Sequence, residues 1–286
     1  MNNFLLLGNS CKEENQYWMK TVEDFIIARQ GTCKSMQVQR FSEMKTKEFC
    51  EGIPKNTQCI IVLGGDGTLI RCAGAVLGMN IPLIGMNLGT VGYLCDIDEQ
   101  NWKESLTQLM EDRFYIEERM MLTGHSEKRS SPSICLNALN DIVIFRYGDL
   151  RVVDYKLYVN HELLNTYTAD GLIISTPTGS TGYSMSCGGP IVDPAASMIV
   201  ITPISPHTWG TRSIVLNSED EIMVEIGERH SGIDEMVKAS YDGDYAEELY
   251  VGDRIMIRKS NEYTKLLKLK RMSFVDNIRK KMQEQK

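Results

Sequence analysis

The first third of the chain alternates apolar, strand-like runs with segments of helical periodicity. The apolar run at residues 4–7 is followed by residues whose spacing places them on one helix face: Trp18, Val22, Phe25 and Ile26. The alternation continues with an apolar run at 59–63, a helical stretch at 69–77 and another apolar run at 81–84. This order predicts a parallel sheet with helices packed on it, over residues 1–100.

The pattern changes after a predicted helix at 102–110. From there, short segments of alternating polarity follow one another, and the spacing predicts strands at 137–145, 153–159, 172–175, 198–202, 221–226, 236–240, 254–258 and 265–269. We expect an all-β domain over residues 101–270. The apolar residues Phe274, Ile278 and Met282 recur every four positions and predict a closing helix over 271–286, with a basic, solvated outer face.

Length and charge narrow the class of protein. The 286 residues suffice for two domains, and no apolar tract is long enough to cross a bilayer. The run at 4–7 also lacks the length and the basic start of a secretory signal. A formal net charge of −7 argues against nucleic acid as a partner, because binding to a phosphate backbone needs an excess of Lys and Arg. We therefore expect neither a membrane nor a nucleic-acid role.

The cysteines and histidines show no metal-binding pattern. Eight cysteines are scattered without a C-x-x-C pair, and several lie in apolar runs, as Cys59 does. The four histidines have no metal-ligand spacing with them, so no metal site built from cysteine and histidine is predicted. Reduced, mostly buried thiols in a cytoplasmic protein fit this pattern best.

The sharpest local feature is Gly64-Gly65-Asp66-Gly67-Thr68, between an apolar strand and a helical stretch. Glycines at such a turn let the backbone approach a ligand closely, and the following helix offers free N–H groups to an anion. The turn therefore suits phosphate. A carboxylate is unusual there, so Asp66 suggests a base or a metal ligand, although capping of the next helix is at least as good an explanation by itself.

Two further segments are rich in glycine. Residues 85–92 form a second Gly-rich turn after an apolar strand, and it could line one crevice with the first turn or be an ordinary tight connection. Residues 170–190 run from an apolar strand into a turn crowded with hydroxyls and glycines. Such a turn suits recognition of a sugar, a phosphate or a purine edge, and a plain loop is the alternative.

Asn140 and Asp141 lie in a predicted apolar strand, where polar side chains are costly unless they are paired or face a ligand. A carboxamide beside a carboxylate can bind the vicinal hydroxyls of a ribose, and a solvent-facing pair is only slightly less favoured. His207, in a Pro-rich corner, is interpreted as structural.

Together these segments resemble the bacterial NAD kinase family. The resemblance rests on GGDGT at 64–68, NLGTVGYL at 87–94, ALND at 138–141, DGLIISTPTGSTGYSMSCGGP at 170–190 and TPISPH at 202–207. GGDGT alone is shared with phosphofructokinases and lipid kinases, and the downstream motifs are the specific ones. The resemblance implies a Rossmann-like N-terminal domain, a C-terminal β-sandwich that binds NAD, and a C-terminal helix at 271–286 that returns to the first domain.

The resemblance also implies a reaction and its residues. Asp66 would accept the proton of the 2′-hydroxyl of the adenosine ribose as that oxygen attacks the γ-phosphate of ATP, with Mg²⁺ carried by ATP. Gly67 and Arg71 would hold nucleotide. The residues implied in NAD binding are Asn140, Asp141, Arg151, Asp170, Thr178, Thr181, Gly182, Tyr183, Ser184, Met185, Ser186 and Asp244. NAD and ATP would be the substrates of a cytoplasmic homo-oligomer, a dimer or a homotetramer.

Three positions depart from the family pattern. Asp141 stands where Glu is frequent, Gly182 where Ala is frequent, and Asp244 where many relatives have Gln. We expect these differences to shift affinity or nicotinamide preference without removing the chemistry. Two rival functions are a lipid kinase, which the hydroxyl-rich segment opposes, and a non-catalytic NAD sensor, which the presence of Asp66 opposes.

Overall fold

The computed structural model describes residues 1–9, 13–38, 47–89, 92–129, 132–148, 152–207, 210–228, 236–270, 274–276 and 278–279. The chain divides into two compact units. The first comprises residues 1–118 and 264–286, and the second comprises residues 119–263. The long strands β5 (Tyr115–Glu127) and β16 (Arg254–Lys268) each pass from one unit to the other.

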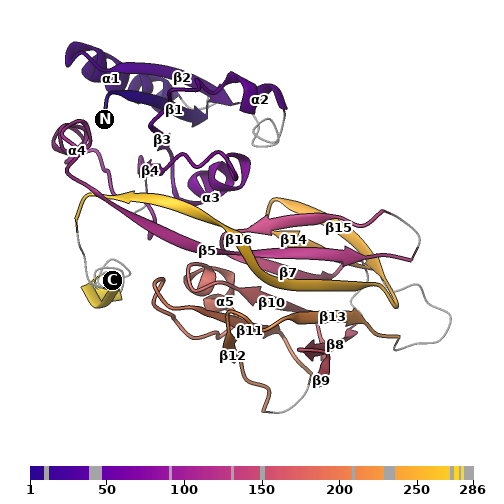
Figure 1. Cartoon of the computed structure of the whole chain (residues 1–286). Coiled ribbons are helices and arrows are strands. Elements are labelled where there is room, and N and C mark those ends of the chain that lie inside the picture. Colours follow the sequence, from indigo (N-terminus) through magenta and orange to yellow (C-terminus); the bar gives the residue numbers. More distant parts are fainter. Residues whose placement is uncertain are drawn as a thin grey trace. The chain divides into compact units, whose positions relative to one another are not determined.

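The first unit is built on a parallel sheet in the order β2-β1-β3-β4 (Figure 1). Its strands are β1 (Asn3–Asn9), β2 (Thr32–Val38), β3 (Cys59–Leu63) and β4 (Leu83–Met86). Leu266 of β16 pairs with Leu83 in parallel and extends this sheet. Its helices are α1 (Glu13–Ala28), α2 (Lys47–Gly52), α3 (Asp66–Ala75) and α4 (Trp102–Met110).

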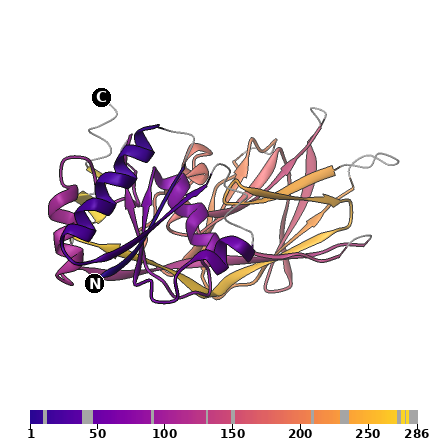
Figure 2. The same cartoon turned by 90° about the horizontal axis from the view of Figure 1, so that it is seen from above.

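Burial explains why the strands of this sheet read as continuous apolar runs. Every residue of β3 is fully buried, because helices cover both faces of a parallel sheet. On one face, Phe4 and Ile61 pack with Val22 of α1 and Leu106 of α4 in one core. α3 contacts β3 and β4, and Figure 2 shows α1 and α3 lying along the sheet. The predicted α/β fold of the N-terminal region is confirmed.

The second unit is a sandwich of two mostly antiparallel sheets. One has the order β12-β11-β10-β7-β14-β15; the other contains part of β16, followed by β13, β8 and β9, with β5 and β6 paired beside it. The further strands are β6 (Cys135–Ala138), β7 (Asp141–Arg146), β8 (Val153–Val159), β9 (Glu162–Ala169), β10 (Gly171–Ser175), β11 (Met198–Ile204), β12 (Ile214–Asn217), β13 (Ile222–Ile226), β14 (Met236–Tyr241) and β15 (Tyr245–Tyr250).

The two sheets of the second unit share one apolar core. Ile144 and Ile174 of one sheet pack with Tyr155, Leu157 and Val224 of the other. A short 3₁₀ turn, η2 (Gly179–Thr181), and the single-turn helix α5 (Tyr183–Ser186) follow β10. The predicted β-rich C-terminal domain is therefore confirmed, with its alternating strands facing this core.

Three expectations need correction. The predicted strands 254–258 and 265–269 are parts of one strand, β16, because its polar middle, which includes Asn261 and Glu262, stays extended. The predicted strand 137–145 is interrupted at residues 139 and 140, which separate β6 from β7. The expectation of mostly buried thiols is wrong: of the seven described cysteines, all free, Cys59 and Cys72 are buried and Cys135 is exposed.

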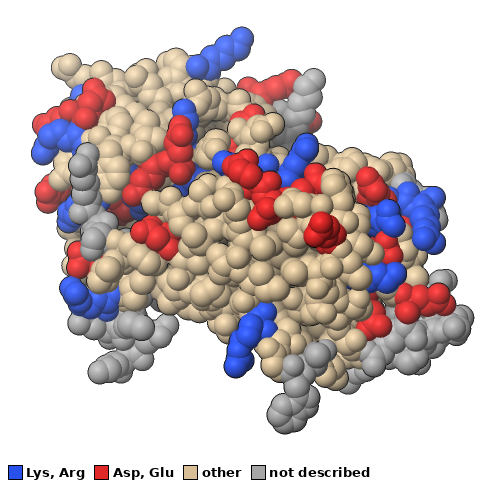
Figure 3. All heavy atoms as spheres, turned by 60° about the horizontal axis from the view of Figure 1, so that its bottom comes forward, with Lys and Arg blue, Asp and Glu red and all other residues tan. Residues whose placement is uncertain are grey.

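The structure describes only part of the C-terminal region. The predicted closing helix lies largely outside the described residues, although 274–276 and 278–279 are helical. No helix among the described residues is long and apolar enough to span a membrane. On the face shown in Figure 3, Lys and Arg side chains lie among Asp and Glu side chains, with uncharged stretches between them.

Candidate functional site

The turn between β3 and α3 brings backbone and side-chain donors together at the carboxyl end of the first unit's sheet. Gly64 has a φ of +149°, and a Cβ there would lie 2.7 Å from Thr68 Oγ1, so this position requires glycine. Asp66 is the first residue of α3, and Gly65 caps the helix without a side-chain hydrogen bond. No side chain therefore caps the start of α3.

The carboxylate of Asp66 is bound by the backbone of a second segment. Its Oδ2 accepts a hydrogen bond from the Tyr93 N–H at 2.6 Å, and its Oδ1 accepts one from the Leu94 N–H at 3.1 Å. Gly92 lies so close that a Cβ there would be 1.9 Å from Asp66 Oδ1. The 92–94 segment thus fixes the orientation of this carboxylate, which does more than occupy a helix terminus.

The two Gly-rich turns of the first unit line one pocket of about 430 Å³. The sequence left open whether these turns share a crevice, and the structure shows that they do, because β3 and β4 are parallel neighbours. Gly67 and Arg71, both predicted to hold nucleotide, line this pocket; Asp66 is not among its lining residues. The other lining residues within the described part of the chain are Asn9, Glu14, Asn15, Gly64, Gly65, Thr68, Asn87, Leu88 and Gly89.

A second pocket, of about 670 Å³, lies within the second unit. Four of the predicted binding residues line it: Asn140, Asp141, Asp170 and Tyr183. The remaining lining residues were not predicted from the sequence: Val143, Phe145, Arg146, Ile204, Ser240, Asp242 and Gly243. Strands β7, β10, β11 and β14 are neighbours in one sheet, which explains why motifs so far apart in the sequence converge here.

Carboxylates and a carboxamide give this pocket an excess of hydrogen-bond acceptors. Asn140 Oδ1 is buried and has no hydrogen-bond partner within the part of the chain that the structure describes. Burial, and to a smaller extent the nearby charge of Asp242, together raise the pKa of Asp141 to about 7. A ligand that donates hydrogen bonds would satisfy these oxygens, because a buried acceptor without a partner is costly.

Asp242 binds the backbone of the segment that carries Asn140 and Asp141. Its carboxylate accepts hydrogen bonds from the backbone N–H groups of Leu139, Asn140 and Asp141, at 2.8, 2.7 and 3.2 Å. Burial raises its pKa to about 6, although these three hydrogen bonds oppose the shift. The residue sits at φ +54° in the turn between β14 and β15, a conformation that Asp tolerates better than most residues.

An ion pair closes another side of the pocket. Arg146 Nε donates to Asp170 Oδ1 at 2.6 Å, so the guanidinium charge is balanced within the pocket. The phenol of Tyr183 is half exposed, and burial of its other part raises its pKa. A flat aromatic ring beside polar acceptors is suited to a planar base.

The predicted residues of the 178–186 segment do not line this pocket, Tyr183 excepted. Thr178 is buried and its hydroxyl accepts a hydrogen bond from Arg119 at 3.5 Å, while Ser184 shares a 3.0 Å hydrogen bond with Thr202. Thr181 donates to the carbonyl of Thr178 at 3.3 Å. Ser186 is exposed and Met185 partly buried in α5.

Gly182 lies beside the pocket, since a Cβ there would be 3.7 Å from Asn140 Nδ2 and 3.9 Å from Asp141 Oδ2. Asp244 is exposed in the β14–β15 turn and is not a lining residue. Arg151 lies outside the described residues. The sequence analysis named Asp244 in the segment Tyr-Asp-Gly-Asp, whereas Asp242 of the same segment lines the pocket and binds the backbone of residues 139–141. The position of Asp242 directly before a glycine, which is typical of a tight turn, is the sequence signal that could have indicated it.

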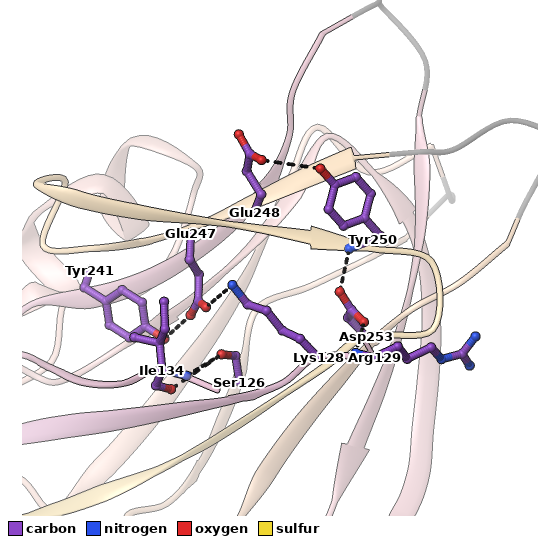
Figure 4. A network of polar contacts seen from close by, with 9 residues as sticks. All are labelled: Ser126, Lys128, Arg129, Ile134, Tyr241, Glu247, Glu248, Tyr250 and Asp253. Atoms are coloured by element: carbon purple, nitrogen blue, oxygen red, sulfur yellow. Dashed lines mark hydrogen bonds and ion pairs between the residues drawn. The ribbon is translucent and has the colours of Figure 1, made fainter. Parts of the chain in front are cut away.

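A buried ion pair supports the β14–β15 hairpin that carries Asp242 (Figure 4). Lys128 Nζ lies 2.9 Å from Glu247 Oε2, and both side chains are buried. The other oxygen of Glu247 accepts a hydrogen bond from the Tyr241 hydroxyl at 2.9 Å. Figure 4 shows Lys128 and Tyr241 pointing toward the same carboxylate, and Tyr241 directly precedes Asp242.

Comparison with known proteins identifies the family. Residues 7–114 match the ATP-NAD kinase N-terminal domain, and residues 139–269 match the ATP-NAD kinase C-terminal domain. The NAD kinase of Agathobacter rectalis is 47% identical over 283 residues, which is 99% of each chain. The NAD kinase of Lachnospira eligens is 40% identical, over 99% of this chain and 100% of that protein.

Solved structures show the same fold. Yeast NADH kinase, complexed with NADH, matches with a TM-score of 0.86 at 23% identity, over 99% of this chain and 88% of that one. An NAD kinase from Archaeoglobus fulgidus in complex with ATP matches with a TM-score of 0.75 at 22% identity, over 96% and 98% of the two chains. The chain therefore belongs to the ATP-NAD kinase family and is an ATP-dependent kinase enzyme.

Proposed function

We propose that this enzyme transfers the γ-phosphate of ATP to the 2′-hydroxyl of the adenosine ribose of NAD, giving NADP and ADP. The observation that carries the proposal is the acceptor-rich pocket of the second unit, where Asn140 Oδ1 is buried without a partner beside Asp141. Ribose hydroxyls and the adenine amino group are hydrogen-bond donors that would satisfy these oxygens. The similarity to NAD kinases and the NADH bound to the yeast enzyme support the same substrate.

In this proposal different residues of the second unit's pocket bind different parts of NAD. Asn140 and Asp141 bind ribose hydroxyls, and Tyr183 packs against the adenine ring, with Asp170 held in place by Arg146. The predicted residues that follow β10 would shape the adenosine side of the pocket: Thr178, Thr181, Gly182, Ser184, Met185 and Ser186. Arg151 and Asp244 remain proposed contacts of NAD.

The pocket of the first unit suits the phosphates of ATP. Glycine backbone at Gly65 and Gly67 and the guanidinium of Arg71 line it at the start of α3. Free N–H groups at a helix start and an arginine both attract phosphate oxygens. The ATP complex of the Archaeoglobus fulgidus enzyme is consistent with a nucleoside triphosphate as the phosphate donor.

We propose that a divalent cation, Mg²⁺, enters with ATP. The described residues include no group of three or more His, Cys, Asp or Glu side chains that could hold a metal ion. Phosphate oxygens are the hard ligands that Mg²⁺ prefers, and it commonly keeps several waters besides. When bound, the cation would neutralise charge on the phosphates during transfer.

Asp66 is proposed as the general base that takes the proton from the 2′-hydroxyl. Two backbone N–H groups fix its orientation, and Gly92 leaves no room for it to turn aside. A fixed carboxylate suits proton transfer, because the base must lie within hydrogen-bond reach of the hydroxyl.

We also propose that the protein works as a homo-oligomer, a dimer or tetramer. Light scattering after size-exclusion chromatography would measure its molar mass.

The test is a direct assay. Purified protein is incubated with Mg-ATP and NAD, and NADP is measured with an NADP-specific dehydrogenase. Asp66→Asn is expected to lower kcat by about 10²- to 10⁴-fold, the usual contribution of a general base, while NAD binding measured by calorimetry persists. The matched control is Asp24→Asn, an exposed aspartate of α1 with an expected kcat like that of the parent. Normal turnover by Asp66→Asn would refute the base assignment, and absence of NADP with the parent enzyme would refute the reaction.

A further inference from the structure

Lys268, the last residue of β16, is a lysine buried in the first unit with 7% of its surface exposed. Its Nζ donates to the backbone carbonyl of Leu94 at 3.1 Å and to Asp96 Oδ1 at 2.6 Å. The next backbone N–H, of Leu269, donates to Asp96 Oδ2 at 2.9 Å. The end of β16 therefore binds both carboxylate oxygens of Asp96 and one carbonyl of the same segment.

The segment bound by Lys268 is the one that binds Asp66. Leu94 is held on both sides: its N–H donates to Asp66 Oδ1 at 3.1 Å, and its carbonyl accepts from Lys268. The N–H of Tyr93 donates to the other oxygen of Asp66 at 2.6 Å. One residue of backbone thus separates the lysine cation from the carboxylate proposed as the base.

Further contacts make this segment a rigid link. The N–H groups of Asp96 and Ile97 donate to the carbonyl of Gly85 at 3.2 and 3.1 Å. The thiol of Cys95 donates to the carbonyl of Gly64 at 3.6 Å, and a Cβ at Gly85 would lie 2.4 Å from its sulfur. A change at Lys268 is therefore transmitted along a packed backbone.

Loss of the lysine cation would disturb the segment for a simple electrostatic reason. Asp96 is largely buried beside Lys268, with 17% of its side chain exposed. Removing one partner of a buried ion pair leaves the other charge without compensation, and the charged group must then move toward water. Movement of Asp96 would shift the Tyr93 and Leu94 N–H groups that orient Asp66.

We propose that Lys268 is a positioning residue for the reaction: through Leu94 and Asp96 it sets the orientation of the Asp66 carboxylate. This inference rests on the proposed function, because it takes Asp66 as the base. Lys268 lines neither of the two pockets described above, so its effect falls on the chemical step and leaves substrate binding unchanged.

The test is the steady-state kinetics of Lys268→Met, which removes the cation and keeps a long side chain. We expect kcat to fall by about 10- to 100-fold, because small displacements of a reacting group cost rates of this order. The KM values for NAD and ATP should stay within about twofold, as for an interaction that acts in the transition state only. Lys268→Arg keeps the cation and should recover most of the lost kcat.

The matched control is Leu267→Ala, on the same strand and in the core of the same unit. Leu267 is buried with 1% exposed, its truncation destabilises the fold, and the core cluster to which it belongs includes none of residues 93–96. Measured below its unfolding temperature, Leu267→Ala should keep the parent kcat. If Lys268→Met does not fold, Asp96→Asn weakens the same ion pair with little change of shape and should show the same fall in kcat.

The outcomes separate this inference from the proposed function. An unchanged kcat in Lys268→Met, or an equal fall in Leu267→Ala, would overturn the positioning role while leaving Asp66 as the base. A loss of kcat that Lys268→Arg restores, with KM unchanged, would support it. Full activity of Asp66→Asn in the same assay would refute the proposed base itself.

Discussion

The carboxylate of Asp242 accepts a hydrogen bond from the Asp141 backbone N–H at 3.2 Å and at the same time raises the pKa of the Asp141 side chain. Burial is the larger cause, and the two together bring this pKa from 3.8 to about 7. The folded protein therefore binds more protons than the unfolded chain in this range of pH. The arrangement keeps the backbone of the pocket in place and makes its carboxyl groups sensitive to pH.

The first prediction concerns the pH dependence of stability. Because the folded state holds the extra proton between pH 3.8 and about 7, the free energy of unfolding should fall as pH rises through this window. One carboxyl contributes a slope of at most about 1.4 kcal/mol per pH unit. Asp141→Asn removes that titration and should flatten the slope measured by urea unfolding between pH 4 and about 7.

A residual slope should remain in Asp141→Asn, because burial also raises the pKa of Asp242, to about 6. Asp24→Asn is the control, since that side chain is exposed on α1 and should leave the slope unchanged. Equal slopes for the parent and Asp141→Asn would show that the Asp141 carboxyl does not titrate in this range.

The second prediction uses the close approach of Gly92 to Asp66. In Gly92→Ala the new Cβ would lie 1.9 Å from Asp66 Oδ1, so the carboxylate has to move away from the Tyr93 and Leu94 N–H groups. We expect kcat to fall by about 10²-fold, as for other small misplacements of a reacting group. Steady-state kinetics of NADP formation would measure it.

Gly74→Ala is the matched control for the same substitution in the same unit. Gly74 is exposed in the last turn of α3, and apart from its chain neighbours and the helix's own backbone no atom lies within 4 Å of the added Cβ. Alanine there should stabilise the helix by about 0.5–1 kcal/mol and leave kcat unchanged. Equal activity of Gly92→Ala and Gly74→Ala would contradict this prediction, because it would mean that the added methyl group at residue 92 does not displace the Asp66 carboxylate.

The sequence predicted the first unit more completely than the second unit's site. Strands such as β3 are buried on both faces, so their apolar runs and the glycines after them mark the elements and the turn directly. Gly67 lies in the GGDGT motif and Arg71 lies about one turn of helix after it, and both line the pocket of the first unit. The outer strands β2 and β9 were both missed; most residues of β9 are exposed, which leaves little alternation to detect.

The pocket of the second unit depends on contacts that no local pattern contains. Asp242 reaches residues about a hundred positions earlier, and its neighbour Asp244 has the same chemistry in the same short segment. Only the pairing of β14 with β7 decides which of the two aspartates meets Asn140. Ser184 shows the converse, since a hydroxyl in the recognised motif is hydrogen-bonded to Thr202 inside the fold.

The third prediction concerns the ion pair beneath the β14–β15 hairpin. Lys128 and Glu247 keep only 8% and 1% of their side chains exposed, and Glu247 also accepts the hydrogen bond from Tyr241. Lys128→Met leaves a buried carboxylate without its cation, which should lower the free energy of unfolding by about 3–5 kcal/mol. Urea unfolding of the full chain would measure this loss.

A second substitution should reverse that loss. In Lys128→Met combined with Glu247→Gln, the neutral amide still accepts the hydrogen bond from Tyr241, and no buried charge remains. We expect the double variant to lie within about 1–2 kcal/mol of the parent, since a buried ion pair gains little over neutral groups of similar size. If the double variant were as unstable as Lys128→Met, the loss would come from packing around the lysine.

Because Tyr241 directly precedes Asp242, Lys128→Met should also raise the KM for NAD, and the double variant should restore it.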